Sequence, residues 1–118
     1  MRIAIPILEK EVNGRKLINP HFGKSNLFAI FDTETGNLEI LENPTLELQR
    51  GRGNYIAKLF SEKGIKAVLV KDIGNGALGK LENFGIEVYL IPKNFKFLDE
   101  TIKLFKEAKL ARLLEPNE

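Results

Sequence analysis

The feature that most constrains the fold is a short apolar run, Ala-Val-Leu-Val-Lys at 67–71, with a helical pattern on each side of it. A strand with so little polar alternation is typical of a parallel sheet that is buried on both faces. Before this run, apolar residues recur at helical spacing over 55–60, where Asn54 is placed to cap the helix and Lys63-Gly64 to end it. Strand–helix–strand units of this kind predict right-handed parallel crossovers.

The other predicted elements surround this run. Apolar segments predict strands at 2–8, 27–32, 38–42 and 87–91, and helical spacing predicts helices at 77–84 and 98–113. The turn at 33–36 makes a hairpin of two of these strands, whereas 9–19 is polar with an Asn13-Gly14 turn, and 115–118 is expected to fray. The order βββαβαβα predicts an α/β fold: a three-layer, mixed five-stranded sheet with flanking helices, of ribonuclease H-like architecture. We expect residues 1–118 to form a single domain.

Composition excludes several classes of site. The 118 residues include no cysteine and one histidine, so a disulfide, a self-contained Cys-ligated cluster and a multi-histidine metal centre are ruled out. The 18 basic and 16 acidic residues give a net charge of +2, too balanced for a general nucleic-acid surface. No apolar run approaches the ~20 residues of a membrane span, and no signal peptide is evident, so we expect a cytoplasmic protein.

Topology brings three of the least core-like segments to one edge of the sheet. With the first strand defined as running up, His21 precedes a descending strand, and the loop before Asn54 follows an ascending one. The strand at 67–71 also ascends and delivers Asp72 to Gly76 to the same edge. Ligands of open α/β sheets bind at the carboxyl ends of parallel strands, so we expect the functional site here.

The loop at this edge that most resembles an anion site is Arg50-Gly51-Arg52-Gly53, followed by Asn54. The glycines let backbone N–H groups approach a ligand, and the following helix N-terminus favours negative charge. A flexible surface loop with solvated arginines is the alternative interpretation. The spacing does not match a P-loop, since no Lys-Ser or Lys-Thr follows, so ATP hydrolysis is not expected.

Two further segments add candidate residues. Gly74, Asn75 and Gly76 could supply a second backbone cradle before the next helix, although the same residues are also ordinary turn formers. His21 could be one ligand to a metal whose other ligands come from elsewhere, although a lone histidine is often merely exposed. Phe22, next to it, is expected to pack into the core.

These segments together resemble the dinitrogenase iron–molybdenum cofactor-binding family, which includes NifX-type carriers and the C-terminal domain of NifB-type proteins. The resemblance covers nearly the whole chain and includes a Gly-rich loop before the first helix. Its other pieces, in order, are Ile3–Pro6, His21–Gly23, Glu62–Ile65, Asp72–Ala77 and Gly85–Tyr89.

The resemblance implies a non-catalytic carrier of an iron–sulfur or iron–molybdenum cofactor, or of its precursor, working with a cofactor-assembly protein. It also implies that His21 is the cofactor contact. One imidazole together with Arg50, Arg52 and backbone N–H groups would hold an anionic metal–sulfide cluster reversibly. Some relatives have a cysteine near the Gly-rich loop, which this chain lacks, so ligation through a cysteine sulfur is excluded here.

Other functions remain open. A small-anion or nucleotide-binding regulatory module would use the same loop without needing His21, and a protein-interaction domain would use the edge to contact a partner. A ribonuclease H-type nuclease is disfavoured because the first strand carries no acid to hold a divalent metal. Nucleophilic catalysis is disfavoured too, since Ser25 has only His21 as a base and no carboxylate to orient it. We therefore expect no enzyme, and the sequence does not indicate an oligomeric state.

Overall fold

The computed structural model describes residues 1–118 as six strands and three helices. In chain order they are β1 (Arg2–Val12), β2 (Arg15–Ile18), β3 (Leu27–Asp32), β4 (Leu38–Glu42), α1 (Arg52–Glu62), β5 (Ile65–Val70), α2 (Asn75–Asn83), β6 (Glu87–Leu90) and α3 (Leu98–Lys106). None of the helices is long and apolar enough to cross a membrane.

The sheet is mixed, as predicted, but it has six strands rather than five. Its order is β4-β3-β1-β5-β6, with β1, β5 and β6 parallel and with β3 and β4 antiparallel to their neighbours. The additional strand is β2, which pairs with an extension of β1 beyond Leu8 through a turn at Asn13 and Gly14, both at positive φ. Sequence patterning missed this hairpin because residues 8–12 are exposed and β2 buries only Ile18, which is too little to mark a buried face. The likeness to ribonuclease H stays a prediction.

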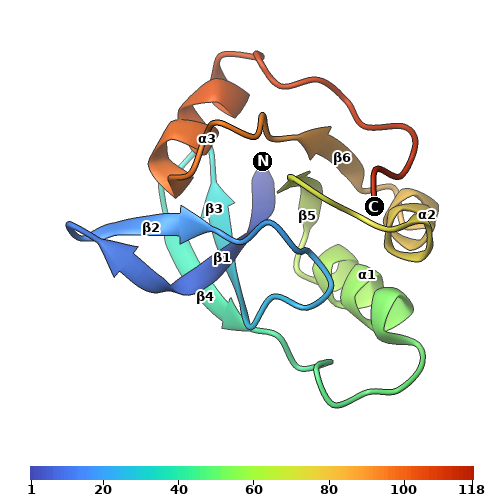
Figure 1. The fold of residues 1–118 in the computed structure, drawn as a ribbon. Helices are drawn as coiled ribbons and strands as arrows, with labels where there is room; N and C mark the ends of the chain where they lie inside the picture. Colours follow the sequence, from blue (N-terminus) through green and yellow to red (C-terminus); the bar gives the residue numbers. More distant parts are fainter.

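Each face of the sheet has its own apolar core, which gives the predicted three layers (Figure 1). Helices α1 and α2 cover one face, where Phe22, Phe28 and Phe60 pack together. Helix α3 covers the other face, with Leu98 buried there as expected. The predicted burial of Phe22 is therefore confirmed.

Several predicted helix boundaries are wrong. Helix α1 begins at Arg52, so its N-cap is Gly51 and not the predicted Asn54, which lies inside the first turn. Gly51 is the last non-helical residue because it adopts the left-handed conformation (φ 75°). Helix α2 begins two residues before the predicted position. Helix α3 ends at Lys106 rather than Leu113, because Ala108 is left-handed (φ 57°) and the chain then turns back along β6.

The tail at 115–118 was expected to fray, but Asn117 anchors it to the segment that follows β5. That segment leads into α2, so the tail is attached to the chain just before this helix begins.

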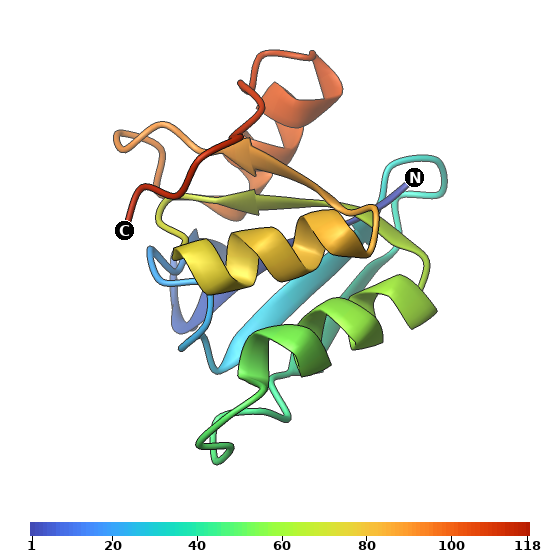
Figure 2. The same cartoon turned by 90° about the vertical axis from the view of Figure 1, so that its right-hand side faces the viewer.

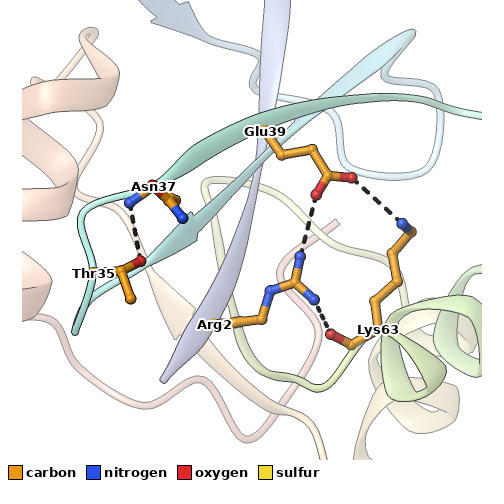
Figure 3. Close-up of polar contacts among 5 residues, drawn as sticks. All are labelled: Arg2, Thr35, Asn37, Glu39 and Lys63. Carbon is orange, nitrogen blue, oxygen red and sulfur yellow. Dashed lines mark hydrogen bonds and ion pairs between the residues drawn. The ribbon is translucent and has the colours of Figure 1, made fainter.

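A polar cluster of Arg2, Glu39 and Lys63 lies where β1 begins and α1 ends (Figure 3). The guanidinium of Arg2 donates to the carbonyl oxygen of Lys63, at the end of α1, and to Glu39 Oε2 in β4 at 3.3 Å. Lys63 Nζ lies 3.4 Å from the other carboxylate oxygen of Glu39. The cluster thus connects β1, β4 and the C-terminus of α1.

We expect Arg2→Met to lower the free energy of unfolding by about 1 kcal/mol, because it leaves the Lys63 carbonyl and Glu39 with only solvent or Lys63 Nζ as partners. Urea unfolding followed by circular dichroism measures this change. Because the pairs are half-exposed, 0.5 M salt should reduce the difference. An unchanged midpoint for Arg2→Met at low salt would contradict a stabilising role for the cluster.

Candidate functional site

The segments that follow β2 and β5 meet at the carboxyl ends of the parallel strands. His21 and Asp72 are paired in a short parallel bridge, and the N–H of Asp72 donates to the carbonyl oxygen of Pro20 at 3.2 Å. The loop that leads into α1 reaches the same region, because Gly51 to Asn54 face Phe22, Gly23 and Gly76 across a pocket. The structure therefore brings together the three segments that topology predicted to converge.

The pocket lies between the starts of α1 and α2 and has a volume of about 250 Å³. Its lining residues are Phe22, Gly23, Gly51, Arg52, Gly53, Asn54, Ile56, Gly76, Ala77 and Lys80. Five of the predicted site residues are among them, whereas His21, Arg50, Gly74 and Asn75 are outside the lining. No acidic side chain lines the pocket.

Both helices present free backbone donors at this end of the molecule. In α1 the first helical hydrogen bond runs from the Tyr55 N–H to the Gly51 carbonyl, so the N–H groups of 52–54 have no acceptor in the chain. In α2 the first bond runs from Leu78 to Gly74, which leaves the N–H groups of 75–77 free. Neither helix has a side-chain cap or an acid in its first turn.

Helices α1 and α2 lie side by side and begin at the same end of the molecule (Figure 2). The positive ends of two helix dipoles therefore lie close to one pocket, where unpaired N–H groups favour a negative charge. Gly53 lies at the contact between the two helices, where a Cβ on it would be in ordinary van der Waals contact, 3.6 Å from the Ala77 Cα and from the Lys80 side chain.

Two basic side chains line the pocket, and they differ in what they contact. The Arg52 guanidinium donates to the carbonyl oxygens of Thr45 and Leu46, each at 3.3 Å, and so supports the loop before α1. Lys80 forms no ion pair and is exposed. The sequence analysis missed Lys80, although its position four residues after Gly76 places it on the same face of α2.

His21 is exposed beside the pocket, and its backbone N–H donates to the Asn19 side chain at 2.9 Å. That contact holds the loop that carries Phe22 and Gly23 into the lining. The chain has no group of three or more His, Asp or Glu side chains that could hold a metal ion. A metal-containing ligand at this edge would therefore take few ligands from the protein, with His21 as the imidazole available.

A second group of positive charges lies where β5 and β6 end. Lys71 Nζ donates to the carbonyl oxygen of Lys93 at 3.3 Å. Burial lowers the pKa of Lys71, and the nearby charge of Lys96 lowers it further. Lys71 and Lys96 therefore add positive charge at this edge of the sheet, with Asp72 as the neighbouring acid.

The fold and the pocket define a small α/β protein with an edge suited to an anionic ligand. The family model for the dinitrogenase iron–molybdenum cofactor matches residues 1–108. The chain therefore belongs to the dinitrogenase iron–molybdenum cofactor family, as the sequence resemblance predicted.

Relatives of the chain match it along almost all of its length. The uncharacterized protein MJ0580 of Methanocaldococcus jannaschii is 38% identical over 115 residues, which cover 95% of this chain and 91% of that protein. A candidate NifB protein of the DUF35 family from Thermotoga has a solved structure with a TM-score of 0.80 and 28% identity, covering 99% of this chain and 97% of that one. The apo form of the orange protein from Desulfovibrio gigas has the same fold, with a TM-score of 0.86 at 24% identity over 99% of this chain and 96% of that one.

Proposed function

We propose that this protein is a non-catalytic carrier that binds an anionic iron–sulfur or iron–molybdenum cofactor, or its precursor, in the pocket between α1 and α2. The observation that carries the proposal is the pair of uncapped helix N-termini beside one pocket that has no acidic lining residue. Membership of the cofactor family supports the choice of a metal–sulfur cluster over other anions.

Each residue of the site has a distinct part in this proposal. The free N–H groups of 52–54 and 75–77 donate to the surface of the cluster, and Lys80 supplies a positive charge. His21 contributes a single imidazole ligand, and Arg50, which is exposed, approaches from the rim. Such a sparse set of contacts suits a carrier, because the cargo has to be released to a cofactor-assembly protein.

The absence of catalysis is also part of the proposal. The hydroxyl of Ser25 is buried and donates to the carbonyl oxygen of Leu27 at 2.7 Å, so this group serves the loop rather than acting as a nucleophile. Asp72, the acid nearest to His21 along the paired segments, lies outside the pocket lining. This arrangement favours binding over turnover.

The experiment mixes the protein anaerobically with isolated iron–molybdenum cofactor and follows co-elution by gel filtration with iron and molybdenum analysis. We expect stoichiometric binding by the wild type and an affinity about tenfold lower for each of His21→Ala and Lys80→Ala. Lys103→Ala on α3 is the matched control, because this exposed lysine lies outside the pocket lining. Elution of the wild-type protein without metal would refute the proposed carrier function.

A small-anion or nucleotide-binding module is the second candidate, and one observation favours it: His21 does not line the pocket. Such a module would bind through the helix N-termini and Lys80 alone. If Lys80→Ala loses affinity for the cofactor and His21→Ala does not, the imidazole is no ligand and this second function is preferred.

A further inference from the structure

The C-terminal strap, residues 107–118, runs back along the edge of the sheet after α3 ends. The N–H of Leu90 donates to the carbonyl oxygen of Ala111 at 2.9 Å, and the N–H of Leu113 donates to that of Val88 at 2.8 Å. The guanidinium of Arg112 contacts Glu82 of α2 and Glu87 of β6, both at 3.1 Å. The strap therefore covers the otherwise open edge of β6. Almost all of it lies beyond the part of the chain that the family model matches.

The strap ends beside the start of α2, as Figure 2 shows. There the Asn117 side chain makes two hydrogen bonds: its Oδ1 accepts from the N–H of Ile73 at 2.9 Å, and its Nδ2 donates to the carbonyl oxygen of Lys71 at 2.7 Å. The backbone N–H of Asn117 also donates to the carbonyl oxygen of Ile73 at 3.3 Å. A single residue thus occupies three backbone groups of the segment 71–73.

That segment determines where α2 begins. Ile73 is fully buried, and Gly74, the next residue, is the N-cap of α2. On its other side the segment is held by the hydrogen bond from the Asp72 N–H to the Pro20 carbonyl. Asn117 therefore completes a clamp that fixes the position of the free N–H groups of 75–77 relative to those of α1.

We propose that Asn117 is a positioning residue for the anion site, and that docking of the strap and binding of the cargo stabilise each other. The inference rests on the proposed function, since it concerns the same pocket. Asn117 does not line the pocket, so it acts through the start of α2 rather than by contact with the cargo. If the cargo binds more tightly when the strap is docked, then by thermodynamic linkage the bound cargo stabilises docking of the strap by the same free energy.

The test uses three variants of the full chain. Asn117→Ala removes both side-chain hydrogen bonds, whereas Asn117→Asp keeps an acceptor for the Ile73 N–H and loses the donor to Lys71. Asn94→Ala is the control, an exposed asparagine in the loop after β6. Hydrogen exchange of the cargo-free protein reports the clamp at the Ile73 amide, with the buried Val68 amide in β5 as the measure of global opening.

For Asn117→Ala we expect exchange at Ile73 at least tenfold faster with Val68 unchanged, and an affinity for isolated iron–molybdenum cofactor roughly five- to tenfold lower. Asn117→Asp should rescue neither property, because its second carboxylate oxygen faces the Lys71 carbonyl oxygen and its charge disfavours an anion, and Asn94→Ala should match the wild type. Faster exchange at Ile73 with unchanged affinity would overturn the positioning role and leave the proposed function standing. A wild type that binds no cofactor would overturn both.

Discussion

Phe22→Ala is expected to lower the free energy of unfolding by about 3–4 kcal/mol, the largest loss of stability that we predict for this chain. Phe22 is 2% exposed, and its ring centroid lies 5.4 Å from that of Phe28 and 6.2 Å from that of Phe60. Removing the ring loses the transfer free energy of the side chain and leaves a cavity beneath the loop that carries Gly23. It also removes two aromatic pairs with tilted or edge-on geometry.

Urea unfolding and a thermal melt measure this loss, and we expect the Tm to fall by roughly 10–15 °C. Phe84→Ala is the matched control, because its side chain is 37% exposed and its loss should change stability by less than about 1 kcal/mol. A difference of under 1 kcal/mol between the two variants would mean that the loop at 19–25 is not anchored through Phe22.

Phe22 also illustrates how much of the fold could be predicted from the sequence. Where burial imposes a periodic pattern, as in the runs around 28–30 and 67–70, the strands and their directions follow from it. The outer part of the β1–β2 hairpin, residues 9–16, has no such pattern, since it is mostly exposed and contacts α3 through the Arg15–Asp99 ion pair. Long-range contacts of this kind leave no local signal in the sequence.

The prediction that α3 extends to Leu113 is wrong because the apolar spacing beyond Lys106 fits two structures. Leu110 and Leu113 continue the helical spacing of the preceding residues, but they are used by an extended segment that packs them against opposite cores. The spacing alone does not distinguish a longer helix from a shorter helix followed by an extended strap. Ala108 takes the left-handed position of a helix C-terminal turn in which the Lys109 N–H donates to the Leu104 carbonyl oxygen at 2.9 Å, and an alanine there gives no sequence signal of the kind that glycine gives.

The candidate site was predictable in location but not in detail. Strand direction alone placed His21, the loop at 50–53 and the segment at 72–76 at one edge. Which side chains at that edge support the loop and which face the pocket depends on side-chain geometry, and the spacing of residues along the chain does not determine it. Arg52 contacts loop carbonyls, whereas Lys80, in the second turn of α2, faces the pocket.

Asn54→Asp is expected to stabilise the fold and weaken binding of the cargo. Asn54 is the third residue of α1, where a carboxylate would accept from the free N–H groups and interact favourably with the helix dipole, adding about 0.5–1 kcal/mol to the free energy of unfolding. The same negative charge would stand in the pocket lining and repel an anionic cluster by about 1–3 kcal/mol, which corresponds to an affinity roughly 10- to 100-fold lower.

The opposite signs of these two effects separate a binding site from an ordinary helix start. Urea unfolding and cofactor co-elution on the same preparation measure both, and Asn83→Asp supplies the control: the same chemical change at the last residue of α2, where the dipole disfavours it. That control should lose a few tenths of a kcal/mol and bind normally. If Asn54→Asp gains stability and binds the cofactor as the wild type does, the free donors of α1 do not hold the cargo. The uncapped start of α1 would then have to be explained without an anion.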